Sequence, residues 1–338
     1  MVRELTSPGT PELPLPMSDV YLSMMRSAAV VHAARLGVFK LLENGALDVT
    51  EAATRLQCHE RGMRSLLDAL VAFGYLRLED GRYANSAFVE AYFTSKGTVD
   101  FTPGLLWTAE AWRMLEDLDG AVQRGGPRVS MWEEMKQRPA TAALFSRYME
   151  AYAAYIVPDV QDAVSLPRDA RRMLDVGGSH GLHSVAFCTR YPELHATVFD
   201  LRESLANTAD VAARHGLSDR ISTRAGNSLV DDLGTGYDVV LLFSVMHNHT
   251  PQENRALLTR LASALKPGGL LVIHDYLRPA TPQPHLSALA LTLMLEVGAT
   301  IHGEEDVRDW LSVAGFHDVN RKELHPQEKG TMLLATRR

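Results

Sequence analysis

Met173 to Gly181 reads M-L-D-V-G-G-S-H-G, and this stretch decides the fold. A short apolar run ends in an acid and is followed by glycines, and a helical pattern then runs from Leu182 to Thr189. Glycines at such a turn let the backbone approach a ligand closely, and the helix N-terminus offers unpaired N–H groups. The stretch therefore predicts the first strand–turn–helix unit of a nucleotide-binding α/β sheet, with a purely structural turn as the alternative.

The spacing of the glycines bears on which nucleotide the turn would bind. Gly177, Gly178 and Gly181 give G-G-x-x-G, whereas dinucleotide sites have G-x-G-x-x-G. Asp175 precedes them, and its carboxylate would repel a pyrophosphate but attract the sulfonium and ammonium groups of S-adenosylmethionine. S-adenosylmethionine is therefore the favoured ligand, and an NAD-dependent enzyme is the alternative.

A second acid supports this interpretation. Thr197 to Leu201 reads T-V-F-D-L and predicts a second strand that ends near Asp200. A carboxylate about 20 residues beyond the glycines can accept hydrogen bonds from both ribose hydroxyls of a nucleoside. On neighbouring parallel strands, Asp175 and Asp200 would face the same crevice, so the two acids together are a more specific signal than the glycines alone.

The composition argues against several kinds of partner. The chain has 338 residues, 46% of them hydrophobic, which is enough for two domains with sizeable cores. Its formal net charge of −7 disfavours nucleic acid and anionic membranes as partners. Cys58 and Cys188 give neither a disulfide framework nor a metal spacing, which favours a cytoplasmic location. The apolar stretch from Leu286 to Leu295 is too short to span a bilayer.

The first hundred residues predict a proline-rich flexible arm, 1–17, followed by a winged-helix domain, 18–100. Helical spacing covers residues 19–42, 49–56 and 60–73, and a pattern of two short strands around an Asp-Gly turn follows. Three helices and a hairpin are typical of a winged helix, which can bind DNA or mediate dimerisation.

The charge of this domain decides between those two functions. Residues 1–100 contain 10 Lys and Arg against 12 Asp and Glu, whereas a DNA-binding face needs a basic excess. We therefore expect a homodimer in which apolar helix faces meet across a two-fold axis. DNA binding stays as the second class of function.

Residues 101–165 predict a helical connector that is rich in aromatic side chains and methionine. Phe145, Met149 and Tyr152 recur at i, i+4 and i+7, so they share one helix face, and Trp107 lies earlier in the segment. Such residues more often form core. The alternative, which we pursue, is that these four line an apolar pocket for an aromatic substrate.

Residues 166–338 continue the alternation and predict a Rossmann-like α/β sheet with helices on both faces. Tyr237 to Phe243 is an almost continuous apolar run, as expected for a buried parallel strand. The other predicted elements are strands at 220–225 and 270–274, helices at 252–265 and 306–314, and a terminal hairpin of 316–324 with 331–336.

Six short motifs occur together in this chain. They are A-A-R-L-G-V-F-K-L-L (33–42), D-V-G-G-S-H-G (175–181), F-D-L (199–201), L-L-F-S-V-M-H-N (241–248), L-K-P-G-G (265–269) and W-L-S-V-A-G-F (310–316). In this combination the chain resembles the plant-type small-molecule O-methyltransferases, the family of the caffeic acid and acetylserotonin O-methyltransferases. Bacterial enzymes of natural-product biosynthesis share that family.

The resemblance implies an N-terminal dimerisation domain and a C-terminal class I methyltransferase domain. It implies S-adenosylmethionine as the cofactor, an aromatic small molecule of secondary metabolism as the acceptor, and no metal. The residues that it assigns to cofactor binding are Asp175, Gly177, Gly178, Gly181, Asp200, Leu201, Gly226, Asn227, Ser228, Phe243 and Ser244.

The chain departs from the family pattern at two motifs. Gly226-Asn227-Ser228 stands where the family usually has Gly-Asp-Phe, whose Asp contacts the adenine. The Asn227 oxygen can still accept from the adenine amino group, whereas Ser228 loses the packing of the Phe. His247-Asn248-His249 stands where the family has His-Asp-Trp, which leaves the nature of the acceptor open.

The resemblance assigns the role of general base to His247. A histidine can take the proton of a phenol, whose pKa is near 10, as the oxygen attacks a methyl group. An acid is expected to orient its ring. Glu304 is favoured over Glu296 and Glu305, although all three can be ordinary surface acids. Met246, Asn248 and Met294 complete the predicted acceptor pocket.

Two further interpretations of the resemblance stay open. The enzyme can methylate a carbon, a nitrogen or a carboxylate instead of a hydroxyl. A family member can also bind the cofactor and perform chemistry other than methyl transfer.

Overall fold

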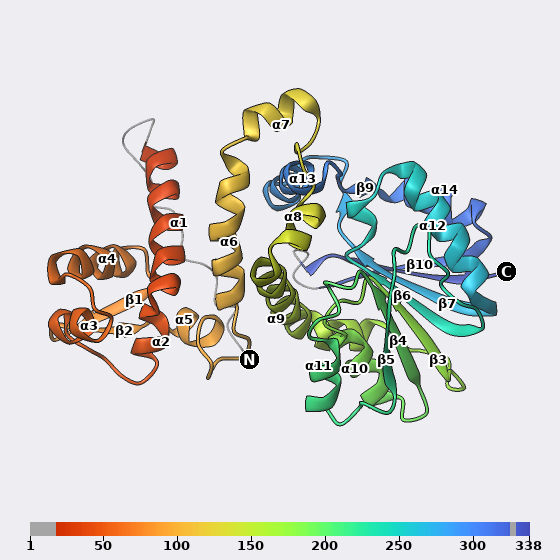
Figure 1. The fold of residues 1–338 in the computed structure, drawn as a ribbon, viewed down its shortest axis with the longest axis horizontal. Coiled ribbons are helices and arrows are strands. Elements are labelled where there is room, and N and C mark those ends of the chain that lie inside the picture. Colours follow the sequence, from red (N-terminus) through yellow and green to blue (C-terminus); the bar gives the residue numbers. More distant parts are fainter. Residues whose placement is uncertain (1–17, 325–328) are drawn as a thin grey trace. The chain divides into compact units, whose positions relative to one another are not determined.

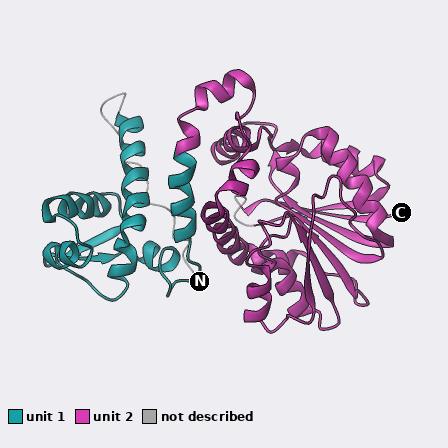
Figure 2. Ribbon diagram, viewed as in Figure 1, with its two compact units in different colours: residues 1–112 teal, residues 113–338 magenta. Residues whose placement is uncertain are grey.

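The computed structural model describes residues 18–324 and 329–338. The chain divides into two compact units, Met1–Trp112 and Arg113–Arg338, which Figure 2 shows in different colours. The predicted arm, 1–17, lies outside the described residues. None of the helices in the described part of the chain combines the length and apolar character needed to cross a bilayer.

The first unit contains the predicted helices and hairpin (Figure 1). The predicted single helix at 19–42 is wrong in one respect. It is interrupted at Gly37, whose φ of 82° lies in the left-handed region that favours glycine. The elements are α1 (Ser18–Leu36), α2 (Val38–Leu42), α3 (Val49–Arg55), α4 (Glu60–Ala72), β1 (Leu76–Glu79), β2 (Arg82–Asn85), α5 (Ala87–Tyr92) and α6 (Thr102–Leu115), the last of which crosses the boundary between the units.

The second unit holds the sheet and takes most of the predicted connector, 101–165. Three helices precede its first strand, and the last of these packs on the sheet through Ile156 and Val160. These helices are α7 (Leu118–Arg124), α8 (Met131–Gln137) and α9 (Pro139–Ala163).

The predicted α/β class is confirmed by a seven-stranded sheet in the order β10-β11-β7-β6-β3-β4-β5. The five strands from β7 to β5 are parallel, and the terminal hairpin adds two antiparallel strands. Their bounds are β3 (Arg172–Val176), β4 (His195–Asp200), β5 (Ile221–Ala225), β6 (Tyr237–Phe243), β7 (Leu265–Asp275), β10 (Phe316–Glu323) and β11 (Thr331–Arg337).

Helices cover both faces of this sheet (Figure 1). Side chains alternate along β6, so Val240 and Leu242 pack under one group of helices while Val239 and Leu241 pack under the other. One face is covered by α12 (Pro251–Ala264) and α14 (Glu304–Val313), and the other by α9, α10 (Leu182–Arg190) and α11 (Thr208–Arg214). The remaining elements are η1 (Met246–Asn248), β8 (Leu277–Arg278), α13 (Pro284–Val297) and β9 (His302–Gly303).

The order of the strands fixes where a ligand can bind. The chain runs outward from β3 to β4 and β5 and then returns to the other side of β3 as β6 and β7. Loops at the carboxyl ends of β3 and β6 therefore leave the sheet in opposite directions. In open α/β sheets this reversal opens the crevice in which ligands bind.

Candidate active site

The carboxyl ends of four adjacent parallel strands bring together the residues that the sequence analysis singled out. Asp175 lies near the end of β3, and Asp200 is the last residue of β4. His247 follows β6 on the short helix η1, and Asp275 ends β7. Because neighbouring parallel strands end at the same side of the sheet, residues up to 100 positions apart in the chain converge there.

The glycine turn after β3 is closely packed. Gly177 has a φ of 72°, and a Cβ on it would lie 2.3 Å from Val245 Cγ2. A Cβ on Gly178 would lie 2.6 Å from Asp175 Cγ, and one on Gly181 would lie 2.9 Å from Thr208 Cγ2. Packing within the protein therefore already demands glycine at all three positions.

The two acids at this turn have unusual electrostatics. Asp175 is 1% exposed, and its Oδ2 accepts a hydrogen bond of 2.7 Å from Ser184 Oγ, while Oδ1 has no partner among the described residues. Burial raises the pKa of Asp175 to about 7. Burial also raises the pKa of Asp200 to about 6. The hydrogen bonds that its carboxylate accepts from the N–H groups of Leu201 and Ser179 lower this pKa but do not offset burial. A positively charged ligand or hydroxyl donors beside them would favour their ionised forms.

The ring of His247 is held by Asp275. Nδ1 of His247 lies 2.5 Å from Asp275 Oδ1, and the same carboxylate accepts from the N–H groups of Tyr276 and of His247 itself. Burial acts to raise the pKa of Asp275, but the charge and hydrogen bond of His247 outweigh it and lower that pKa. An ionised carboxylate can only accept, so Nδ1 carries the proton, and in the neutral form of the ring Nε2 has a lone pair.

The expected contact between Glu304 and His247 is wrong. Both oxygens of Glu304 form ion pairs, one with Arg308 and one with Arg321, at the start of α14. Asp275 occupies the place that we assigned to Glu304. The sequence contained only part of the signal for it: Asp275 directly follows the predicted strand at 270–274, but the strand order that places this strand beside β6 comes from the structure.

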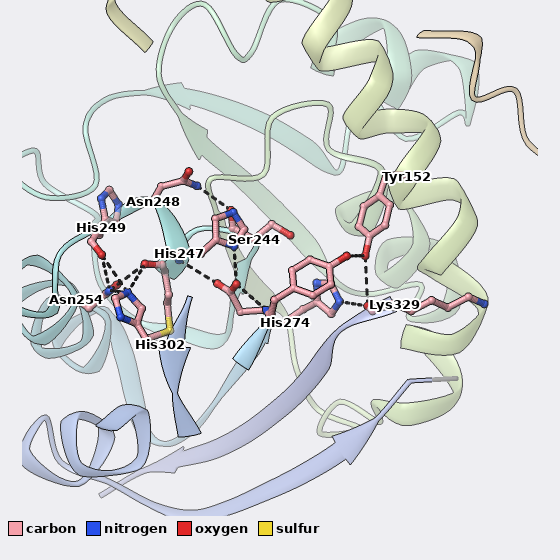
Figure 3. A network of polar contacts seen from close by, with 12 residues as sticks. Tyr152, Ser244, His247, Asn248, His249, Asn254, His274, His302 and Lys329 are labelled. Carbon is pink, nitrogen blue, oxygen red and sulfur yellow. Dashed lines mark hydrogen bonds and ion pairs between the residues drawn. The ribbon is translucent and has the colours of Figure 1, made fainter. Parts of the chain in front are cut away.

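Two polar side chains, Asn254 and His302, hold the short helix that carries His247 (Figure 3). Asn254 Nδ2 lies 2.9 Å from the Met246 carbonyl, and His302 Nε2 lies 3.1 Å from the same oxygen and 3.0 Å from that of His249. The Met246 side chain, predicted for the acceptor pocket, is 2% exposed and packs in the core against α12 and α14 instead. These contacts hold the loop after β6 in one conformation.

Comparison with known proteins identifies the family of this chain. Residues 116–317 match the O-methyltransferase domain, and residues 18–95 match the O-methyltransferase dimerisation domain. The chain belongs to the O-methyltransferase family. It is an S-adenosylmethionine-dependent methyltransferase.

Relatives of this methyltransferase act on different atoms. It is 29% identical, over 92% of both chains, to a 3-hydroxy-5-methyl-1-naphthoate 3-O-methyltransferase of Streptomyces sahachiroi. It is 27% identical, over 79% of this chain and 77% of the relative, to an L-tyrosine C(3)-methyltransferase of Streptomyces lavendulae. The crystal structure of human N-acetylserotonin methyltransferase has the same fold, with a TM-score of 0.86 at 23% identity over 97% of this chain and 99% of that one.

The residues of this methyltransferase fit its cofactor. Asp175 has an unpartnered buried oxygen and a raised pKa, and Asp200 has a raised pKa at the next strand end, so both suit a cationic ligand that carries hydroxyl groups. No group of three or more His, Cys, Asp or Glu side chains suited to a metal ion occurs among the described residues.

The remaining predicted cofactor residues lie at or just beyond the carboxyl ends of β4, β5 and β6. The N–H of Leu201 binds Asp200, and a Cβ on Gly226 would lie 2.5 Å from the Phe199 ring. The Asn227 oxygen accepts from the N–H of Leu229, so one lone pair is left for an adenine, and Ser228 is half-buried beside it. Phe243 stacks edge-on against His183, and Ser244, with a φ of 56°, donates its N–H to the His274 carbonyl.

Helix α9 carries three of the seven predicted acceptor residues. Phe145 packs against Trp132 and Tyr148, and Met149 lies on the same face. The Tyr152 hydroxyl forms a hydrogen bond with that of Tyr276 and donates to the Lys329 carbonyl, as Figure 3 shows. Of the other predicted pocket residues, Asn248 donates to the Ser244 carbonyl, Met294 is half-buried on α13, and Trp107 is buried in the first unit.

Glu296, on α13, lies near His247. It is 8% exposed, and burial raises its pKa to about 7, against the lowering effect of His247. The pKa of Tyr148 on α9 is raised mainly by the burial of that tyrosine, and the charge of Glu296 is the second cause. Glu296 therefore belongs to the surroundings of His247, whereas Glu304 does not.

Proposed function

We propose that this enzyme transfers the methyl group of S-adenosylmethionine to a hydroxyl of an aromatic small molecule, with His247 as the general base. One observation carries the proposal. Asp275 holds the proton of His247 on Nδ1, so Nε2 of the neutral ring can accept one, and His247 follows the strand that pairs with β3, on which Asp175 lies. The naphthoate O-methyltransferase, which is similar over 92% of both chains, supports an aromatic hydroxyl as the acceptor.

The mechanism follows from these positions. When bound, S-adenosylmethionine supplies a methyl group on a sulfonium, which is electrophilic without help from a metal. Nε2 of His247 takes the proton of the acceptor hydroxyl as its oxygen attacks, and the Asp275 carboxylate stabilises the imidazolium that forms. Asp200 binds the ribose hydroxyls, and Asp175 favours the positive end of the ligand. The rest of the rate comes from aligning oxygen, carbon and sulfur.

The cofactor site is tested by calorimetry with S-adenosylhomocysteine. We expect binding in the low micromolar range, about −8 kcal/mol. Asp200→Ala should weaken it by about 2–3 kcal/mol, because charge-assisted hydrogen bonds to the ribose are lost. Binding of NAD without binding of S-adenosylhomocysteine would contradict the proposal.

The base is tested by replacing His247. His247→Ala should lower the turnover of a phenol acceptor by about 100- to 10,000-fold and leave the affinity for S-adenosylhomocysteine almost unchanged. The loss should shrink for phenols of lower pKa, which need less help in losing their proton. Near-full methylation by His247→Ala would instead point to a carbon or carboxylate acceptor, and the activity should survive chelators in either case.

We propose that the enzyme acts as a homodimer built on residues 18–100. The match of residues 18–95 to the dimerisation domain supports this. Helix α1 also exposes four apolar side chains on one face, namely Val20, Tyr21, Met24 and Met25. A monomer would leave this stripe in water, so a second copy is the expected cover. Binding to DNA or membranes forms no part of the proposed function.

A further inference from the structure

Glu296 is a buried carboxyl group to which the mechanism gives no role. It is 8% exposed on α13, and the structure records neither a hydrogen bond nor an ion pair for it within residues 18–324 and 329–338. Leaving a carboxylate buried and unpaired costs free energy, because the charge loses its hydration without gaining a partner. A buried acid of this kind is ionised at a lower cost when a cation from outside the chain pairs with it.

Residues on two other elements interact with this carboxyl group. It interacts electrostatically with His247 on η1 and with Tyr148 on α9, and α13 packs against η1. Tyr148 in turn packs edge-on against Phe145, with ring centroids 6.5 Å apart. The carboxyl group is therefore near enough to interact both with the proposed base and with a tyrosine that packs on Phe145 of the predicted acceptor pocket.

Building on the proposed function, we propose that Glu296 binds a cationic nitrogen of the acceptor, so that the enzyme prefers aromatic hydroxyl compounds that carry an ammonium group. An ammonium would donate hydrogen bonds to the carboxylate, and the faces of the nearby rings attract cations. A neutral acceptor would leave Glu296 unpaired, and an acidic acceptor would meet a like charge. The raised pKa of Glu296, about 7, agrees with this role, because a bound cation would favour its ionised form.

Three matched phenols test the proposal: tyramine is cationic, 4-ethylphenol is neutral, and 3-(4-hydroxyphenyl)propionate is anionic. Their affinities are measured by calorimetry on the full chain saturated with S-adenosylhomocysteine, and kcat/KM is measured separately with S-adenosylmethionine. Tyramine should bind about 10- to 100-fold more tightly than 4-ethylphenol, as a charged hydrogen bond implies, and the propionate should bind most weakly.

Glu296→Gln should remove this preference by weakening tyramine about 10- to 100-fold while leaving 4-ethylphenol within about twofold. Glu305→Gln is the matched control, because Glu305 is exposed at the start of α14 and its loss removes the same charge from the chain. If Glu296→Gln does not fold, the ranking of the three phenols on the native enzyme decides the matter.

Three results would overturn the inference. They are equal affinities for tyramine and 4-ethylphenol on the native enzyme, no binding of tyramine at millimolar concentrations, and a Glu296→Gln variant that loses turnover equally on all phenols. The last would make Glu296 a positioning residue for His247. Binding preference without any methylation of phenols would contradict the proposed function and leave this inference standing, so the two failures are distinguishable.

Discussion

The hydrogen bond between His247 and Asp275 determines the chemistry at the scale of single residues. A carboxylate on Nδ1 selects the tautomer in which Nε2 can accept a proton. The two residues are 28 positions apart, and neither has a local reason to contact the other. The pair therefore depends on the neighbouring ends of β6 and β7.

Asp275→Asn should lower turnover by about 100- to 10,000-fold, although the Asn side chain has almost the same shape as that of Asp. The amide can donate to Nδ1, which would place the imidazole proton on Nε2 and block the base. Single-turnover rates with a phenol and S-adenosylmethionine measure this loss, and the affinity for S-adenosylhomocysteine should stay within a few-fold.

Glu304→Gln is the control for that experiment. Its carboxylate pairs with Arg308 and Arg321 at the start of α14, so turnover should stay within about twofold. If this variant instead lost as much activity as Asp275→Asn, Glu304 would regain the orienting role that the sequence analysis gave it.

Asp175 makes the stability of the cofactor-free enzyme depend on pH. Its pKa in the folded chain is about 7, against about 3.9 in an unfolded chain. Between these values the folded state binds more protons, so stability falls as the pH rises from about 4 to about 7. Asp175→Asn removes the cost of ionising a buried carboxyl group. The variant should therefore be more stable than the native chain, and this difference in unfolding free energy should be about 1–3 kcal/mol larger at about pH 8 than at about pH 5.

Urea unfolding at the two pH values measures that difference. The same variant should bind S-adenosylhomocysteine more weakly, because a charge beside the ligand is lost. An equal effect of Asp175→Asn at both pH values would show that the carboxyl group is not protonated in the folded, cofactor-free enzyme.

At the scale of elements, the strand–turn–helix unit around β3 is the part on which the site depends. Its first glycine, Gly177, packs against Val245 in the loop after β6, so one contact joins the cofactor turn to the loop that carries His247. Gly177, one of the glycines that suggested a ligand in the sequence, therefore also packs two loops of the site against each other.

Gly177→Ala should destabilise the protein by about 2–4 kcal/mol, through overlap with Val245 and the cost of a positive φ. In a Val245→Ala background the same change should cost only about 1–2 kcal/mol, because the overlap is gone and the backbone strain is left. Chemical unfolding of the four chains in this cycle tests it, and strictly additive effects would exclude the overlap as the cause.

At the scale of the whole molecule, the apolar stripe on α1 is the feature that a monomer leaves unexplained. Met24 is 58% exposed in the middle of that stripe. Met24→Asp should therefore weaken self-association by at least about tenfold without lowering the melting temperature of the dissociated chain. Val230→Asp is the control, because Val230 is 70% exposed in the second unit.

Light scattering across a dilution series measures this effect. The native chain and Val230→Asp should be dimers at micromolar concentrations, and Met24→Asp should dissociate there. A native chain that is already a monomer would contradict the proposed assembly.

The sequence by itself determined the class of fold and the position of the cofactor turn. Apolar runs such as Tyr237 to Phe243, and the glycines after Asp175, are local signals, because a strand buried on both faces and a tight turn each constrain their own residues. The predicted helices at 49–56, 60–73, 252–265 and 306–314 agree with the structure to within about two residues, whereas the helix at 19–42 is broken at Gly37 and helices α11 and α13 were not predicted.

Only the tertiary structure decided which side chains meet. Asp275 rather than Glu304 holds His247, the Met246 side chain enters the core, and Glu296 is left buried without a partner in the described chain. These outcomes depend on the order and register of the strands, which pair Phe243 of β6 with His274 of β7. Contacts between residues tens of positions apart are set by that packing, and no local pattern of residues encodes them.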